Sequence, residues 1–246
     1  EDEWCCGNML FSVGLVREAE KLMKHNLEAI EKKGVKTVLT SCAECYRMLK
    51  VDYPKLLGKS TEDLSFKVVH TTEFLNNLLK EGKIKMSNPI PMRVAYHDSC
   101  SLGRLSEPWI HWEGTRKRWG VVDPPLNRRR GTYGIYEAPR QLLDSIPKLE
   151  RVEMIRTREN TWCCGAGRGT RVAFKDFAVW SAKERLKEAE KLGWSGSRWA
   201  GVWTGPRRQA GYVKDSHGLN SWPYGHTYDE PRRMWMHEDI ANRVLN

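Results

Sequence analysis

The hydrophobic pattern near the start of the chain predicts a helix and then a strand. Apolar residues recur at helical spacing over residues 15–30, with lysine and glutamate between them, and Gly34 stands where a C-terminal cap is expected. Residues 35–39 have the composition of a short strand, which leads into the pair Cys42 and Cys45. In open α/β sheets, ligands gather at the carboxyl ends of strands, so this cysteine pair stands at a favourable position.

The same arrangement returns further along the chain. Predicted strands over 66–69 and 93–96 run into His70 and into the segment from His97 to Cys100, and the first of them leads to a helix over 71–79. The pattern then predicts a short helix over 138–146, a strand over 151–155 and a long amphipathic helix over 169–193. Helices alternating with short strands predict an α/β fold.

Two stretches of the chain repeat each other. Cys6 and Gly34 lie 28 positions apart with a predicted helix between them, and Cys164 and Gly193 lie 29 positions apart, also with a helix between them. We therefore expect two pseudo-repeated units, each a small mostly parallel sheet flanked by helices. The expected boundaries are 1–90 for the first unit, 91–193 for the second and 194–246 for a tail.

Two segments depart from the repeat. Residues 104–131 are rich in Trp, Arg and Gly, and we interpret them as an insertion in a loop over the second site. Such a loop would be a substrate lid, a docking surface or simply a solvated excursion. Residues 194–246 contain 5 of the 11 tryptophans and lose helical and strand periodicity. We interpret this tail as an out-of-frame reading of the gene or a degenerate end, the alternative being a divergent C-terminal extension.

Composition and charge narrow the class of protein. Of the 246 residues, 40% are hydrophobic and 29% charged, an ordinary globular balance. The sequence has no apolar run long enough to span a membrane and no signal peptide, so we expect a cytoplasmic protein without a transmembrane segment. It lacks a starting Met and begins just before Cys5, which we interpret as an interior piece of a longer protein. The net charge is +10, but the arginine clusters match no nucleic-acid-binding motif, and we expect no nucleic-acid partner.

The cysteines carry the chemistry. Their number, 7, is odd in a chain without an export signal, which favours metal ligands or redox groups over disulfides. They are Cys5, Cys6, Cys42, Cys45, Cys100, Cys163 and Cys164. Adjacent cysteines favour a larger iron–sulfur cluster, because neighbouring sulfurs seldom meet one small tetrahedral ion without strain. A zinc site made by the first four cysteines and a thioredoxin-like dithiol remain alternatives, whereas merely buried thiols explain the pairing poorly.

These motifs resemble a known family. The Cys-Cys-Gly triplets at 5–7 and 163–165, the pair Cys42 and Cys45, and the segment from His97 to Cys100 are similar to the cysteine-rich CCG domain of the heterodisulfide reductase family. The resemblance covers residues 5–193. It implies two CCG units, each binding a non-cubane [4Fe-4S] cluster at which a disulfide is reduced by successive one-electron transfers.

The resemblance also implies the ligands and the partners. The first site would use Cys5, Cys6, Cys42 and Cys45 with an upstream cysteine, and the second would use Cys100, Cys163 and Cys164. The chain would be an oxidoreductase subunit that takes electrons from a ferredoxin-like or flavoprotein partner, acts on a disulfide substrate, and reaches a membrane only through a partner. The alternatives are a non-catalytic electron-relay subunit and a zinc-stabilised interaction module.

Two histidines at strand ends are candidates for proton transfer. His97, three residues before Cys100, is the predicted catalytic residue, because it would lie close enough to relay a proton to a leaving thiolate. His70 is the weaker candidate, and for both a structural role is the alternative. Asp98 is expected either to cap the following turn or to act on substrate.

Overall fold

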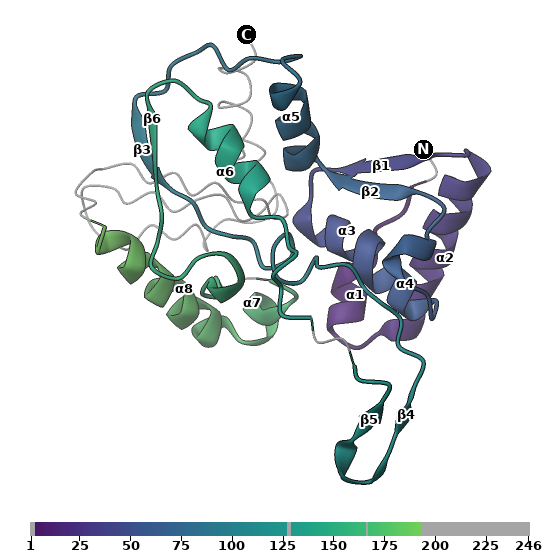
Figure 1. Ribbon diagram of the computed structural model, residues 1–246. Coiled ribbons are helices and arrows are strands. Elements are labelled where there is room, and N and C mark those ends of the chain that lie inside the picture. The colour runs from purple at the N-terminus through teal and green to yellow at the C-terminus, as the bar shows by residue number, and fades with distance from the viewer. Residues whose placement is uncertain (1–2, 127–128, 166, 193–246) are drawn as a thin grey trace.

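The computed structural model describes residues 3–126, 129–165 and 167–192, so the predicted tail 194–246 lies outside the described residues (Figure 1). The helices are α1 (Asn8–Ser12), α2 (Val16–Lys32), α3 (Ala43–Arg47), α4 (Tyr53–Leu56), α5 (Thr71–Lys80), α6 (Glu137–Asp144), α7 (Thr170–Ala173) and α8 (Lys175–Glu190). The strands are β1 (Thr37–Thr40), β2 (Lys67–His70), β3 (Met92–Ala95), β4 (Thr115–Arg116), β5 (Val122–Asp123) and β6 (Leu149–Val152). A π-helical turn, η1 (Met48–Asp52), joins α3 to α4. None of the helices described is long and apolar enough to cross a bilayer.

The first unit is a small parallel sheet with helices packed on it. Strand β1 pairs in parallel with β2, from Thr37 opposite Lys67 to Thr40 opposite His70. Ala19 and Met23 of α2, Tyr46 of α3 and residues of the following π-turn bury their side chains in one core with the sheet. The predicted helix, cap and strand near the start of the chain are confirmed, and Gly34 takes the left-handed conformation expected of a C-terminal cap (φ 62°).

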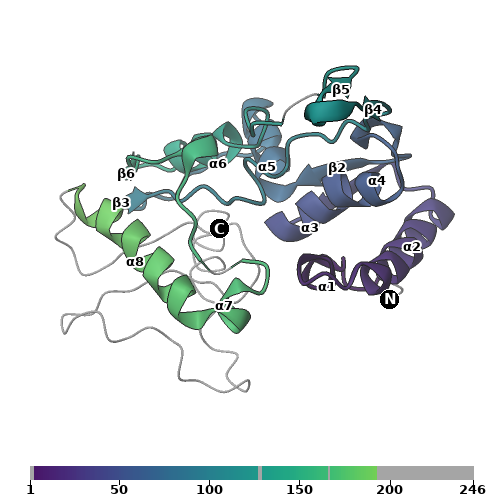
Figure 2. The same cartoon turned by 90° about the horizontal axis from the view of Figure 1, so that it is seen from below.

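The second unit has the same construction. Strand β3 pairs in parallel with β6, from Met92 opposite Leu149 to Ala95 opposite Val152. Helix α6 packs against α5 of the first unit, and Asn76 donates a hydrogen bond of 2.7 Å to Gln141 across that contact. Figure 2 shows the two units side by side, with α8 along the second unit and α7 at the end of α8 that is nearer the first unit. The predicted α/β class, with two units built on small parallel sheets, is confirmed.

A glycine against a helix alanine fixes each Cys-Cys-Gly turn. Gly7 has φ 82°, and a Cβ there would lie 3.4 Å from the backbone of Ala19 in α2. Gly165 has φ 76°, and a Cβ there would lie 2.4 Å from the carbonyl oxygen of Ala178 in α8. The positive φ favours glycine in both turns, and at Gly165 the close approach of the helix backbone requires it as well.

The long helix predicted over 169–193 is two helices. Phe174 ends α7 and precedes α8 with φ −138° and ψ 66°, values outside the helical region. One residue with a non-helical backbone does not interrupt the apolar periodicity of the sequence. The pattern therefore predicts one continuous helix.

The Trp- and Arg-rich segment contains a hairpin that the sequence pattern did not predict. Strands β4 and β5 pair antiparallel, each with only two residues, too few to show alternation. The segment leading into them lies along the first unit, where the backbone of Trp109 exchanges hydrogen bonds of 2.8 Å with Thr61. Arg104, at the start of this segment, donates a hydrogen bond to Cys100 of the predicted second site, and the placement of the whole insertion over that site stays a prediction.

Candidate cysteine sites

Three cysteines from two separate segments meet in the first unit. Cys42 immediately precedes α3 at the carboxyl end of β1, and Cys45 lies one turn further along that helix. The Sγ of Cys45 is 3.4 Å from the Sγ of Cys6, and the Cys45 thiol is also hydrogen-bonded to Cys42. Cys5, the neighbour of Cys6, is exposed. The fold therefore gathers three of the thiols predicted for the first site, those of Cys6, Cys42 and Cys45, at one end of the sheet.

Hydrogen bonding divides the charge among these thiols. The Cys45 thiol donates to the two sulfurs beside it, which lowers the pKa of Cys42 to about 6 and also lowers the pKa of Cys6. The pKa of Cys45 is raised, because the two hydrogen bonds that it donates stabilise its protonated form. Thiolates are the form that ligates metal, so near neutral pH the group already contains ligands in the required state.

The backbone around the first Cys-Cys pair is held by polar side chains. Asn26 of α2 donates hydrogen bonds of 3.2 Å to the carbonyl oxygens of Trp4 and Cys5, and accepts one of 2.9 Å from the Trp4 amide. Tyr53 donates a hydrogen bond of 3.1 Å to the carbonyl oxygen of Cys6. Protein groups therefore hold the backbone that carries the two sulfurs.

The second unit brings Cys100 and Cys163 together. Cys100 lies beyond the end of β3, and its thiol donates to the sulfur of Cys163, which raises the pKa of Cys100 and lowers that of Cys163. The amide of Gly165 donates a further hydrogen bond of 3.3 Å to the Cys163 sulfur. Cys164 is hydrogen-bonded to Cys163, so the predicted second set of thiols also shares one place.

The backbone of the second Cys-Cys pair is also held by a helix side chain that bonds to a cysteine carbonyl oxygen, a contact called a clamp below. Ser181 of α8 donates a hydrogen bond of 2.7 Å to the carbonyl oxygen of Cys163, as Asn26 of α2 does for Cys5 in the first unit. Trp162 donates one of 3.0 Å back to the carbonyl oxygen of Ser181. Sequence reasoning missed both clamps, because a serine or asparagine inside a helix gives no signal of its distant partner.

An arginine contacts the second thiol group directly. Arg104 donates a hydrogen bond of 3.1 Å from Nη2 to the Sγ of Cys100, and its Nη1 donates one of 3.2 Å to the carbonyl oxygen of Glu159. A guanidinium at this distance stabilises negative charge on sulfur. Arg104 was missed from the sequence, although its position four residues after a cysteine, one turn of helix away, was a usable signal.

The two histidines are both buried and uncharged. Arg185 donates a hydrogen bond of 2.9 Å to Nδ1 of His97, and burial together with that guanidinium lowers the pKa of His97 to about 3. Nδ1 is thus an acceptor, so the neutral ring carries its proton on Nε2. His70 caps α5 by accepting from the amide of Thr72, and burial lowers its pKa to about 4. The role of His97 in proton transfer stays a prediction.

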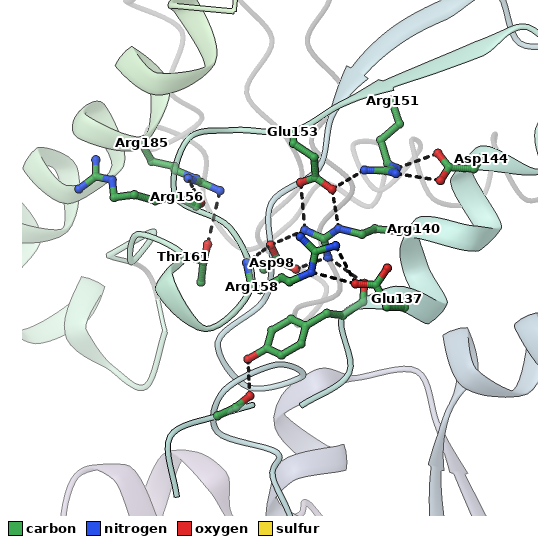
Figure 3. Close-up of polar contacts among 12 residues, drawn as sticks. Asp98, Glu137, Arg140, Asp144, Arg151, Glu153, Arg156, Arg158, Thr161 and Arg185 are labelled. Carbon is green, nitrogen blue, oxygen red and sulfur yellow. Dashed lines mark hydrogen bonds and ion pairs between the residues drawn. The ribbon is translucent and has the colours of Figure 1, made fainter. Parts of the chain in front are cut away.

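A buried ion network supports the strand end that carries Cys100 (Figure 3). Arg140, only 1% exposed, forms two hydrogen bonds with Asp98, of 2.6 and 2.7 Å, and two with Glu153, of 2.6 and 3.0 Å. Asp98 also accepts a bond of 2.8 Å from the amide of Arg158. These three bonds join Asp98 to Arg140 and Arg158, far along the chain, rather than to the turn after Asp98 that it was predicted to cap.

The two thiol groups flank one junction between the units. Glu44, between the two cysteines of the first unit's pair, accepts a bond of 3.0 Å from Asn8, and a Cβ on Gly167 would lie 3.7 Å from its other oxygen. Asp52 of the first unit is 3.2 Å from Arg47 and 3.9 Å from Arg168 of the second. The loop that follows the second Cys-Cys-Gly turn therefore rests on the first unit.

A cavity of about 570 Å³ reaches the first thiol group. Cys6, Cys42 and Cys45 line its inner part, and residues 37–41 along β1 line one side. In the part of the chain that the structure describes, no three His, Cys, Asp or Glu side chains are arranged to hold a single metal ion. Each group instead offers sulfurs from separate segments, a donor set that fits the thiolate ligation of an iron–sulfur cluster with several irons.

Comparison with known proteins places these motifs. The family model of the CCG cysteine-rich domain matches residues 1–50 and 125–195, which contain every cysteine of the chain except Cys100. One subunit of the dihydromethanophenazine:CoB–CoM heterodisulfide reductase from Methanosarcina acetivorans is 42% identical over 192 residues, or 77% of this chain and 40% of that subunit. The corresponding subunit from Methanosarcina barkeri is 40% identical over the same length, so the chain spans about 40% of the length of these relatives.

Two further relatives have other names. EtfAB:quinone oxidoreductase from Syntrophomonas wolfei is 31% identical over 178 residues, covering 72% of this chain and 20% of that protein. One subunit of the fumarate reductase (CoM/CoB) from Methanothermobacter marburgensis is 30% identical over 188 residues, covering 76% and 30%. The shared Cys-Cys-Gly turns, the matching helix clamps and the two regions of the family model lead to one conclusion: the chain belongs to the CCG cysteine-rich domain family of heterodisulfide reductase subunits and related iron–sulfur proteins.

Proposed function

We propose that this chain is an iron–sulfur electron-transfer part of a larger redox complex, with one cluster in each unit. The observation that carries the proposal is the meeting of sulfurs from separate segments, of Cys6 with Cys42 and Cys45 and of Cys100 with Cys163. Cys5 and Cys164, beside them in sequence, would each add one ligand, and the first set would also use a cysteine upstream of this chain. Relatives that are subunits of multi-subunit oxidoreductases support a role with other subunits as electron donors.

The finer proposal is that a disulfide is reduced at a non-cubane [4Fe-4S] cluster. When bound, such a cluster would supply single electrons, and splitting a disulfide into two thiols consumes two electrons and two protons. The residues of this chain would hold the thiolates in place and stabilise their charge, as Arg104 does at Cys100. His97, neutral with Nδ1 accepting from Arg185, would donate a hydrogen bond from Nε2 to the leaving thiolate, and the two protons would come from solvent.

The test of cluster binding is anaerobic reconstitution of the longest natural polypeptide that contains this chain. We expect a brown protein with iron and acid-labile sulfide, and a loss confined to one unit when Cys45→Ser or Cys100→Ser is introduced. Ser41→Ala, an exposed neighbour of Cys42, is the matched control and should keep both clusters. Protein that binds zinc but neither iron nor sulfide would instead support the interaction-module alternative.

Disulfide reduction is tested separately from cluster binding. Addition of thiol to the oxidised, cluster-loaded protein should produce a new paramagnetic species in EPR, and Cys100→Ser should remove the part that arises in the second unit. Loaded protein that exchanges electrons with a reductant but shows no thiol-dependent signal would be a relay subunit, and the reductase proposal would then fail.

A further inference from the structure

The hairpin of residues 112–123, called the finger below, is a rigid element. The amide of Lys117 donates a hydrogen bond of 2.7 Å to the carbonyl oxygen of Val121, which closes the turn. At the base, Trp112 donates one of 2.9 Å to the carbonyl oxygen of Pro124. Gly114 packs so closely that a Cβ there would lie 2.3 Å from the Trp112 ring and 2.7 Å from the carbonyl oxygen of Asp123. These contacts hold the two short strands together.

Hydrogen bonds and ring contacts fix the base of the finger to the first unit. The amide of His111 donates a hydrogen bond of 2.9 Å to Ser60, adding to the two bonds between Trp109 and Thr61. The Trp109 ring lies between Lys55 and Arg129, whose charged groups are 5.1 and 5.7 Å from its centroid. From this base the finger projects beyond the first unit, away from both sheets (Figure 1).

The tip of the finger combines basic and apolar side chains. Trp119 is 87% exposed and Val121 57% exposed, so neither contributes to the core. Arg116, Lys117 and Arg118 stand immediately before them, and of these Lys117 is paired with Asp123 at 2.5 Å. Trp119 and the glycine that follows both have positive φ, 66° and 75°, which turns the indole outward. An exposed tryptophan beside arginines is typical of a surface that contacts another phase or molecule.

We propose that this finger docks on the surface of an anionic lipid bilayer. Trp119 and Val121 would enter the interfacial region, where an indole places its ring among acyl chains and its N–H among headgroups. Arg116 and Arg118 would contact lipid phosphates, since basic residues next to an anionic leaflet are attracted to it. The finger lies between the two regions that match the family model.

The small size of the tip favours a bilayer over a protein partner. A stable protein–protein interface buries roughly 800 Å² on each partner, far more than one tryptophan and one valine provide. A reversible membrane contact needs less, because a short apolar insertion and a few basic residues act together. A convex, projecting tip also reaches a flat bilayer without a complementary groove.

Sedimentation with lipid vesicles tests the proposal in the full chain. We expect the wild-type chain to bind vesicles of mixed phosphatidylglycerol and phosphatidylcholine, to bind pure phosphatidylcholine poorly, and to lose affinity as salt is raised. Trp119→Ala should weaken binding by about tenfold or more. Arg116→Glu combined with Arg118→Glu should abolish it. All these side chains lie at the tip, so the melting temperature should not change.

A matched charge reversal elsewhere supplies the control. Lys21→Glu combined with Lys24→Glu, at exposed positions of α2, changes the net charge equally and should leave binding near the wild-type level. Equal loss in this control would assign the binding to overall charge and overturn the proposal. Equal binding to the two kinds of vesicle, or unchanged binding of Trp119→Ala, would also overturn it. The proposal would also be overturned if the chain did not bind lipid vesicles but formed a Trp119-dependent complex with a purified protein.

Discussion

The buried pair of Arg140 and Asp98 makes the stability of the second unit depend on one guanidinium. Both residues are 1% exposed, and Arg140 also binds Glu153 and donates a hydrogen bond of 2.8 Å to the carbonyl oxygen of Tyr136. Arg140→Met removes the charge and keeps much of the apolar stem. The carboxylate of Asp98 would then stay buried with only the Arg158 amide as donor.

Breaking a buried pair by removing one partner costs about 3–5 kcal/mol, because an uncompensated charge is left behind. We expect Arg140→Met to lower the free energy of unfolding by about this amount in urea titrations followed by circular dichroism. Adding Asp98→Asn should recover part of the loss, since it neutralises the stranded charge. The sum of the two single losses should therefore exceed the loss in the double variant.

The control is an exposed ion pair in the same unit. Arg93 and Glu150 are 3.1 Å apart with side chains 47% and 66% exposed, so Arg93→Met should cost no more than about 1 kcal/mol. If Arg140→Met costs as little as this control, or if the two losses at Arg140 and Asp98 simply add, the network does not support the strand end that leads to Cys100.

Three further predictions concern single residues. Arg104→Met should lower the midpoint potential of the loaded protein by several tens of millivolts in a redox titration, because a positive charge beside the Cys100 sulfur is lost; an unchanged potential would contradict this. Gly165→Ala should cost about 2–4 kcal/mol in urea, from left-handed strain and overlap with Ala178, and a cost below about 1 kcal/mol would show that the turn can shift. His70 has its pKa lowered to about 4 from 6.5, so the unfolded chain binds an extra proton between these values and stability falls as pH falls through them. His70→Asn, which keeps a capping acceptor, should flatten that pH dependence in urea titrations, and an unchanged slope would assign it to other groups.

The sequence predicted the elements that have a strong period. The helix over α2, the strands β1 to β3 and the positions of the thiols at strand ends follow from apolar spacing and cysteine placement alone. It placed the strand β6 a few residues late, at 151–155, because the residues of β6, Leu-Glu-Arg-Val, show little alternation of apolar and polar positions. Local periodicity fixes an element more reliably than it fixes where the element begins and ends.

The sequence could not show how distant residues meet. Asp98 and Arg140 are separated by 42 positions, and His97 and Arg185 by 88, so no local pattern links them. The finger was missed for the opposite reason, since its strands are too short for any period to appear. Pairings of this kind depend on the packing of whole units, which a single sequence does not display.

The side chains that clamp the two Cys-Cys-Gly turns separate folding from cofactor insertion. Asn26 and Ser181 secure the carbonyl oxygens of Cys5 and Cys163 through bonds among protein atoms only, whereas classical zinc fingers have no structure until the ion arrives. In a newly made chain, both Cys-Cys-Gly turns would therefore be formed before iron and sulfide are inserted. Loss of a cluster to oxygen would then leave a folded chain that can take up a new cluster, rather than an unfolded one.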